Sequence, residues 1–164
     1  MSPTKDEFRR VMGTFATGVT IVTTAHAGEV RGMTANSVAS VSLDPLSVLV
    51  CVNREAITFG LLDAGQVFCV NILAEHQEAL SRGCAKPDTP EAALIGVPHR
   101  IGKTGAPILD GALAYLDCRV VDSMDFGTHR IFIGEAVDLD ATDAQPLLFF
   151  RGKYFRAIEP LTTS

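Results

Sequence analysis

Residues 33–52 read MTANSVASVSLDPLSVLVCV, and the change of pattern within them decides the fold. The first part is small and polar, Asp44-Pro45 marks a turn, and an almost wholly apolar run follows from Val48 to Val52. A short apolar run bounded by a turn is typical of a strand buried in the middle of a sheet. We therefore predict a central strand over Val48–Val52.

The residues before this stretch predict a helix and a hairpin. Thr4–Glu7 has the form of a capping box, and apolar residues follow at helical spacing from Phe8 to Phe15. From Val19 to Thr24 the period changes to two, and Thr and Val dominate as they do in strands. A turn over His26–Glu29 then leads into a returning strand over Val30–Ala35.

The residues after it continue the alternation of short elements. Thr58 is the expected N-cap of a short helix that Gly65 ends. The Gly- and Pro-rich region from Gly83 to Gly111 has weak periodicity, so we expect little regular structure there. The remaining expected elements are strands over Val67–Leu73, Leu113–Val121 and Arg130–Val137, a helix over Glu75–Arg82, and a last hairpin of Leu147–Phe150 and Tyr154–Arg156.

Short strands joined mainly by hairpins favour an antiparallel barrel over a doubly wound sheet, which needs helices alternating regularly with strands. The chain has 164 residues, a length that suits one domain with one core. We therefore predict a mainly β fold with short flanking helices and a single domain over residues 1–164.

Composition narrows the classes of partner. Hydrophobic residues make up 47% of the chain and charged residues 20%, which indicates a folded protein. Some of its apolar residues are then available to line a subunit interface. The net charge of -5 argues against nucleic acid as the main partner, because phosphate backbones need clustered Lys and Arg. No long uncharged apolar run occurs and the N-terminus is polar, so we expect a cytoplasmic protein without a membrane span.

Several common site motifs are missing. The chain has no Gly-x-Gly pair, as a Rossmann dinucleotide site requires, and no Gly-x-Ser-x-Gly hydrolase elbow. Gly102-Lys103-Thr104 resembles the end of a phosphate-binding loop, but Val97 stands where that loop needs its first glycine. The four cysteines and four histidines are dispersed, so we expect no metal site and expect the cysteines to be structural.

Five segments, in order along the chain, carry a family resemblance. They are Gly18–Thr23, Met33–Pro45, Leu49–Asn53, Phe68–Leu73 and Gly127–Glu135. Together they resemble the short-chain flavin reductases, the reductase components of two-component flavin monooxygenases. The resemblance runs from about Phe8 to Arg156, and it implies an FMN-binding split barrel, six-stranded and antiparallel, that dimerises and binds flavin near the subunit interface.

The resemblance and the chemistry of the residues together give a set of candidate flavin-binding residues. They are Thr34, Ala35, Asn36, Ser37, Val38, Ser40, Val41, Ser42, Cys51, Val52, Asn53, Thr58 and Tyr154. Hydroxyls among small residues let backbone N–H groups approach a phosphate and a polyol chain closely, and a helix N-terminus favours an anion. The same residues are also compatible with a Ser-rich surface loop, a turn-forming Asn53, an ordinary N-cap at Thr58 and a solvated hairpin at Tyr154.

His129 is the candidate for the nicotinamide side of the flavin. The family has a Gly-Asp-His pattern here, and Thr128 replaces the acid in this chain. The resemblance implies that His129 contacts the nicotinamide, while the missing carboxylate removes one means of orienting its ring. A lone histidine of this kind is also compatible with a structural role.

The function implied is an NAD(P)H:flavin oxidoreductase in which hydride passes from the reduced nicotinamide to FMN or FAD, with NADH or NADPH as co-substrate and FMN favoured. The reduced flavin is then expected to reach a separate monooxygenase. Two alternatives stay open: a flavin carrier or sensor with little turnover, and a split-barrel reductase of another acceptor such as a corrinoid or a quinone.

Overall fold

The structure is a computed structural model that describes residues 1–156 and 158–161. In this part of the chain the main sheet has seven strands, in the order β3-β2-β6-β9-β10-β5-β4, and all its pairs are antiparallel. The strands are β2 (Thr20–His26), β3 (Glu29–Ala35), β4 (Val38–Leu43), β5 (Leu46–Asn53), β6 (Val67–Ile72), β9 (Ala114–Phe126) and β10 (His129–Ala141). The predicted mainly β, antiparallel fold is confirmed.

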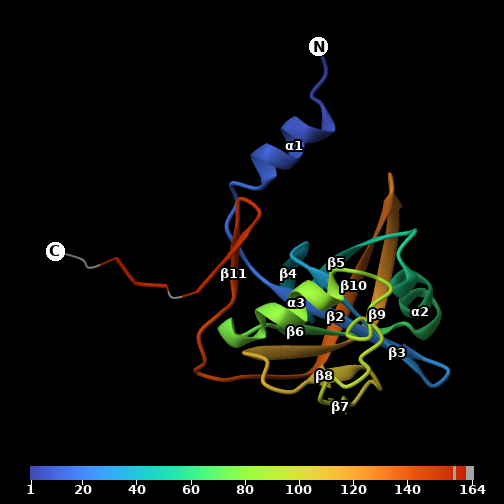
Figure 1. The fold of residues 1–164 in the computed structure, drawn as a ribbon. Helices are drawn as coiled ribbons and strands as arrows, with labels where there is room; N and C mark the ends of the chain where they lie inside the picture. The colour runs from blue at the N-terminus through green and yellow to red at the C-terminus, as the bar shows by residue number, and fades with distance from the viewer. Residues whose placement is uncertain (157, 162–164) are drawn as a thin grey trace.

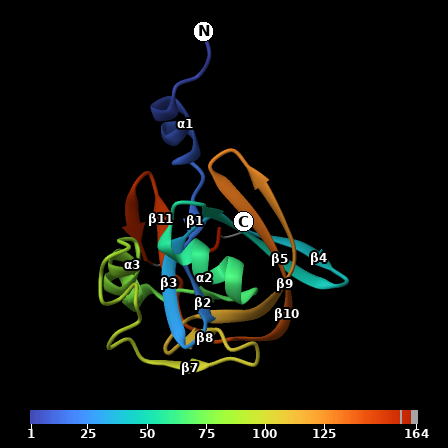
Figure 2. The same ribbon diagram turned by 90° about the vertical axis from the view of Figure 1, so that its right-hand side faces the viewer.

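The sheet curves around an apolar core, with α2 (Ile57–Gly65) lying across one end of the curve (Figure 2). Val22, Val50, Phe68 and Phe132 are all fully buried in this core, and Leu62 of α2 packs with them. Gly134 of β10 is needed here because a Cβ at this position would collide with the ring of Phe68. The predicted central strand is confirmed, since β5 pairs with β10 on one side and β4 on the other.

Two smaller sheets complete the strands. β1 (Thr17–Gly18), β11 (Leu148–Phe150) and β12 (Lys153–Phe155) form one, and β7 (His99–Ile101) and β8 (Pro107–Leu109) form the other. The β7–β8 hairpin lies in the region expected to have little regular structure. It is held by contacts distant in sequence: the buried Asn71 side chain accepts a hydrogen bond of 2.8 Å from the backbone N–H of Leu109. Sequence periodicity carries no sign of such a contact.

The N-terminal helix α1 (Lys5–Met12) stands away from the body of the molecule (Figure 1). Its capping box is as predicted: the backbone N–H of Glu7 donates to the Thr4 hydroxyl at 3.2 Å, and the backbone N–H of Thr4 donates to the Glu7 carboxylate at 2.8 Å. None of its residues is buried, so local capping and not packing within this chain defines the helix. None of the helices in the described residues is long and apolar enough to span a membrane.

The expected ends of α2 were wrong at both termini. The N-cap is Ala56, in extended conformation, and Thr58 lies inside the first turn. The helix includes Gly65 and ends at Gln66, which adopts the left-handed conformation with φ 54°. Gly65 is required for another reason: a Cβ there would collide with the carbonyl oxygen of Ala25, where α2 crosses β2.

The polar stretch after β3 forms a strand as well as a loop. Asn36 and Ser37 link the strands, and β4 then pairs with β5 at the edge of the sheet, with an irregularity in register between Ser40 and Ser42. The predicted helix over Glu75–Arg82 is present as a short 3-10 turn, η1 (Glu75–Gln77), followed by α3 (Glu78–Cys84). α3 lies on the surface beside β3.

Candidate functional site

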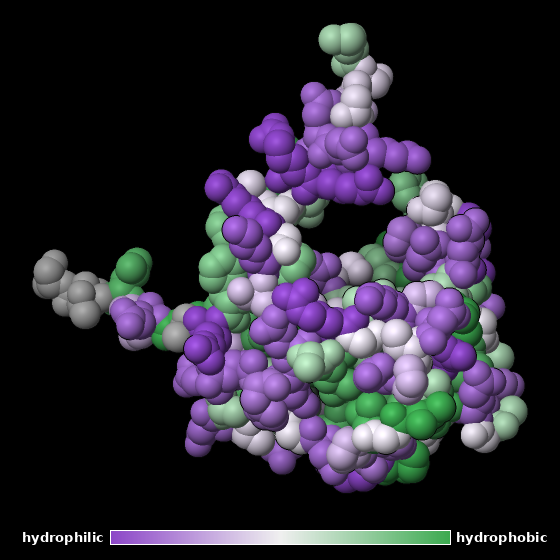
Figure 3. Space-filling model, viewed as in Figure 1, coloured by the Kyte–Doolittle hydropathy of each residue, from purple (hydrophilic) through white to green (hydrophobic). Residues whose placement is uncertain are grey.

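A continuous groove follows β3 and its link to β4, and we call it the β3 groove. It consists of three hollows of about 330, 240 and 500 Å³. Thr34 and Ala85 line both the first and the second hollow, and Asn36 and Phe149 line both the second and the third. The third hollow opens beneath α1, where the space-filling view shows a gap between that helix and the body (Figure 3).

The first hollow lies at the N-terminus of α2. Ala56 provides no side-chain cap, so the first N–H groups of the helix, at Ile57 and Thr58, have no capping oxygen. Arg31 lines the same hollow, and its guanidinium donates to the carbonyl of Pro87 at 3.0 Å. The positive end of the helix dipole and an arginine side chain together suit an anionic group such as a phosphate.

The second hollow has an aromatic and hydroxyl lining. The hydroxyls of Tyr154 and Ser81 are 2.7 Å apart, and the Thr34 hydroxyl donates to the Ser81 carbonyl at 2.6 Å. The Tyr154 ring meets Phe149 edge to face, with centroids 5.2 Å apart, and the Arg82 guanidinium lies 4.7 Å from the Tyr154 centroid. These contacts fix the Tyr154 ring in one orientation, with the Arg82 guanidinium over the ring and Phe149 against it.

The third hollow is bounded by the start of β4, by β5 and by α1. Ser37 and Cys51 hold its floor together: the Ser37 hydroxyl donates to the Cys51 carbonyl at 3.2 Å, and the Cys51 N–H donates to the Ser37 carbonyl at 3.1 Å. Phe8, Met12 and Phe15 line its other side. Partial burial raises the pKa of the Cys51 thiol, so the thiol behaves as an apolar neutral group in this wall.

The structure brings together most, but not all, of the residues predicted to bind flavin. Those that line the β3 groove are Thr34, Ala35, Asn36, Ser37, Val38, Cys51, Thr58 and Tyr154. Ser40, Val41 and Ser42 lie farther along β4, outside the three hollows. The Val52 side chain is fully buried in the core, so only its backbone is available to a bound flavin.

His129 and Asn53 meet at another place, near the N-terminal end of α2. They lie opposite each other across the β10 and β5 pairing, and both are exposed. His129 Nδ1 is 2.8 Å from the hydroxyl oxygen of Thr128, which therefore provides a hydrogen-bonding partner in place of the carboxylate. The Asn53 carboxamide oxygen accepts from the Glu55 N–H at 3.0 Å, which is the turn-forming role that was the alternative for this residue.

Sequence reasoning missed several groove residues, among them Arg31, Ala85 and Phe149. Each comes from a different element, β3, the end of α3 and β11, and no local pattern connects them. Arg31 alone carried a usable signal, because it is the one cation on a strand that leads directly into the small polar stretch.

The Gly102-Lys103-Thr104 segment has a structural role. The Thr104 N–H and hydroxyl both donate to the buried Asp117 carboxylate, the former at 2.9 Å, and Lys103 forms an ion pair with Asp138 at 2.9 Å. Hydrogen bonding from Lys103 lowers the pKa of Asp138.

Three of the cysteines are buried, as expected, and burial raises the pKa of the Cys84 and Cys118 thiols to about 12. Within the described residues no three His, Cys, Asp or Glu side chains gather as a metal site needs.

Residues 12–157 match the family model described as the flavin reductase like domain. The chain is 44% identical over 150 residues, 92% of this chain and 80% of the other, to the reductase component of a 4-nitrophenol 4-monooxygenase/4-nitrocatechol 2-monooxygenase from Rhodococcus opacus.

Two solved structures extend the likeness to the whole fold. The flavin reductase PheA2 in its native state superimposes with a TM-score of 0.86 and 39% identity, covering 96% of this chain and 100% of the other. The NADH:FAD oxidoreductase of Streptomyces globisporus, solved with NAD and FAD fragments, gives a TM-score of 0.87 and 37% identity, covering 94% and 93%.

Proposed function

The chain belongs to the flavin reductase family, and we propose that its β3 groove is where this reductase binds the flavin it reduces. The enzyme is an NAD(P)H-dependent flavin reductase, and the observation that carries this conclusion is the family match over residues 12–157. The flavin, when bound, accepts hydride from the reduced nicotinamide. The protein's part is to bind and orient both rings and to exclude water from between them.

The residues of the first hollow fit the flavin phosphate. Ile57 and Thr58, at the uncapped start of α2, line one space of about 330 Å³ together with Arg31, whose guanidinium lies 3.5 Å from the Glu29 carboxylate. Thr58 is only 6% exposed, so little water competes with a bound phosphate oxygen for the N–H groups at the start of the helix. Arg31 is held in place by the Pro87 carbonyl, so little side-chain entropy is lost when it binds an anion.

The rest of the groove fits the remaining parts of the flavin. Thr34 and Asn36 supply polar groups along the path from the first hollow to the third, where a ribityl chain needs them. Tyr154 and Phe149 provide a rigid aromatic wall for the ring system. FMN and FAD share the phosphate, ribityl chain and ring that these residues would hold, so the same contacts serve both flavins.

We place the nicotinamide on the His129 side of the flavin. Asn53 ends β5, from which the chain runs directly into α2, and His129 at the start of β10 pairs with Asn53 across the sheet. Strand pairing therefore brings His129 toward the proposed phosphate site. The exposed imidazole is available to donate or accept one hydrogen bond beyond the one with Thr128. Its proposed role is to orient the nicotinamide, while no proton transfer by the protein is required for hydride transfer.

We also propose that two copies form a homodimer through α1 and the neighbouring sheet face. Phe8 of α1 and Phe15, just after the end of that helix, are 65% and 70% exposed, which is unusual for aromatic side chains. Leu49 and Cys51 of β5 continue the apolar surface in the third hollow. A second copy of the chain packed there would bury both faces and close the groove from solvent.

The reduced flavin is proposed to leave the enzyme for a separate monooxygenase, as expected for a chain so similar to monooxygenase reductase components. We further propose that residues 1–164 form a single domain. A cytoplasmic location stays a prediction from the sequence.

Steady-state oxidation of NADH and NADPH with FMN, FAD and riboflavin as acceptors tests the function. A reductase oxidises the nicotinamide only when a flavin is added, with many turnovers for each protein chain. One turnover for each bound flavin would instead indicate a flavin carrier or sensor. Riboflavin, which lacks the phosphate, is expected to bind more weakly than FMN.

A further inference from the structure

The β9–β10 hairpin, in which His129 is the first residue of β10, projects beyond the body of the sheet. Residues 121–129, at the tip of the β9–β10 hairpin, are all exposed, and Gly127 and Thr128 form the turn (Figure 1). Apolar packing therefore does little to fix the position of His129. A ring that has to orient a substrate needs another source of rigidity.

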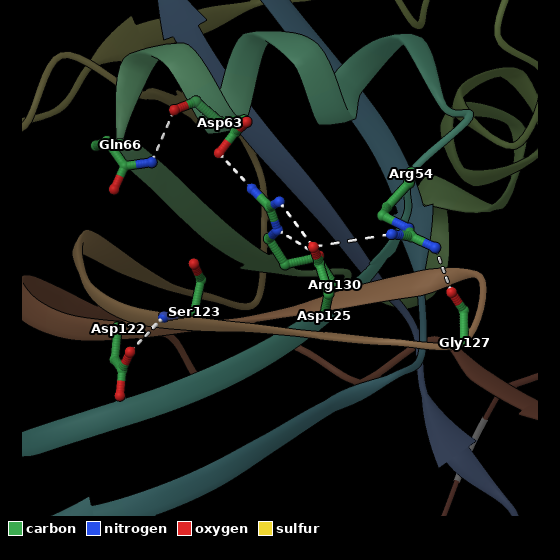
Figure 4. Close-up of polar contacts among 8 residues, drawn as sticks. All are labelled: Arg54, Asp63, Gln66, Asp122, Ser123, Asp125, Gly127 and Arg130. Carbon is green, nitrogen blue, oxygen red and sulfur yellow. Dashed lines mark hydrogen bonds and ion pairs between the residues drawn. The ribbon is translucent and has the colours of Figure 1, made fainter.

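Ion pairs and hydrogen bonds around Arg130 provide that rigidity (Figure 4). The Arg130 guanidinium donates to both carboxylate oxygens of its cross-strand neighbour Asp125, at 2.6 and 3.1 Å, and to Asp63 of α2 at 2.6 Å. It thus joins both strands of the hairpin to the helix. The planar fork of arginine makes this arrangement possible, because it donates in several directions at once.

Arg130 is well shielded for a residue on a projecting hairpin. Its side chain is 22% exposed, and the guanidinium lies 5.0 Å from the centroid of Phe59 and 5.8 Å from that of Phe132. Reduced access of water strengthens the pairs relative to those of freely exposed side chains. This cluster is therefore unlike the exposed Arg9 and Asp6 pair on α1.

Arg54 holds the turn from the other side. Its backbone N–H donates to the carbonyl of Thr128 at 3.1 Å, and its guanidinium donates to the carbonyl of Gly127. The same guanidinium lies 3.7 Å from Asp125, which connects it to Arg130. Both peptide groups before His129 are thus fixed by one arginine, and the strand after it is fixed by the other.

We propose that Arg130 is a positioning residue for hydride transfer, which fixes the hairpin tip against α2 and so holds His129 in place. Adjacent residues of a strand point to opposite faces, so Arg130 acts on His129 through the backbone and does not need to contact it. The inference rests on the proposed function, in which His129 faces the nicotinamide.

The test is a double-mutant cycle measured by stopped-flow reduction of enzyme-bound flavin at saturating NADH. Arg130→Gln is expected to lower the reduction rate about five- to tenfold, and Arg130→Lys by less, because the ammonium keeps the charge but loses the fork. In the His129→Ala background the same Arg130→Gln change is expected to cost less than about twofold, because the residue it positions is already absent. Flavin affinity is expected to stay within about twofold throughout.

Two further variants keep the result interpretable. Lys103→Gln removes a more exposed ion pair, to Asp138 on the same strand β10 but far from His129, and should leave the reduction rate unchanged. Asp63→Asn weakens the same link from the α2 side and replaces Arg130→Gln if that variant does not fold.

The possible results distinguish a failure of the positioning role of Arg130 from a failure of the proposed reductase function. Equal losses from Arg130→Gln with and without His129 would overturn the positioning role while leaving the reductase activity intact. So would an unchanged rate in both Arg130→Gln and Asp63→Asn. A wild-type protein without flavin-dependent NADH or NADPH oxidation would instead remove the proposed function itself.

Discussion

His129 of β10 lies directly opposite Asn53 of β5, although the two residues are far apart in the chain. This pairing brings the proposed nicotinamide side to the strand end that leads into α2, whose uncapped N-terminus is the proposed phosphate site. The Thr128 hydroxyl, 2.8 Å from His129 Nδ1, provides a partner for the imidazole at the position where the family resemblance implies an acid. A hydroxyl can orient the ring without adding charge to it.

His129→Ala is expected to lower kcat/KM for NADH about five- to thirtyfold, which corresponds to roughly 1–2 kcal/mol of lost transition-state stabilisation. The lower end is favoured because a neutral hydroxyl, and no carboxylate, holds the ring. Stopped-flow reduction by NADH measures the effect, and a flavin titration is its control. Unchanged reduction rates would make His129 structural, whereas a large loss of flavin affinity would place it in the flavin site.

Substitutions in the polar stretch are expected to depend on position. Ser37→Leu should weaken flavin binding by about 1–3 kcal/mol, because Ser37 lines the third hollow and the larger side chain both blocks it and loses a hydrogen bond. Ser40→Leu should have a smaller effect, since Ser40 lies beyond the hollows on the exposed edge strand. Fluorescence titration with FMN measures both. Equal affinities for wild type and Ser37→Leu would return this stretch to the status of a surface loop.

The ion pairs of the hairpin predict a pH dependence of stability. Hydrogen bonding from Arg130 lowers the pKa of Asp125 in the folded protein below the value of about 3.9 expected when unfolded. The stabilisation is therefore fully present above pH 4 and is lost as pH falls through the lower, folded pKa.

Thermal unfolding of wild type and Asp125→Asn should differ by a constant amount between about pH 5 and pH 8, and the difference should shrink below about pH 4. Asp143→Asn is the control, because Asp143 makes no ion pair in the described part of the chain. A difference that grew on acidification would contradict the assigned pairing.

Removal of the exposed aromatic side chains on α1 and just after it is expected to weaken the proposed homodimer. The double variant Phe8→Ser and Phe15→Ser should elute as a monomer of 17.5 kDa by light scattering under conditions where wild type is dimeric. Ile95→Ser, at an equally exposed residue (69%) away from α1, should leave the dimer intact. A wild-type monomer that still binds flavin normally would show that the apolar face of α1 does not form the interface.

Local signals in the sequence predicted local structure well. The Thr4 and Glu7 capping box was correct because its partners are three residues apart and need no tertiary contact. The ends of α2 were wrong because Ser and Thr near a helix start do not specify which residue leaves the helical conformation. Gly65 was read as a helix terminator, but close packing against β2 is what requires it.

The candidate site was predicted in part, for the same reason. The segment around Thr34 and Asn36 was found because its small polar pattern is continuous in sequence. The pairing of His129 with Asn53 and the contact of Arg130 with Asp63 depend on how distant strands and a helix are arranged, and no pattern along the chain reveals it. The wall formed by Ala85 and Phe149 has no polar signal at all.

The most direct test of the central claim, that flavin binds along the β3 groove, is an FMN titration of Ala85→Trp. Ala85 is exposed at the end of α3 and lines both the first and the second hollow, so an indole there fills their junction without disturbing the core. Ala144→Trp, at an exposed loop position outside the groove, is the matched control. We predict that Ala85→Trp loses FMN affinity and NADH oxidation together, by at least about tenfold, while its unfolding temperature and the control variant match wild type. Wild-type FMN affinity in a folded Ala85→Trp would contradict the claim.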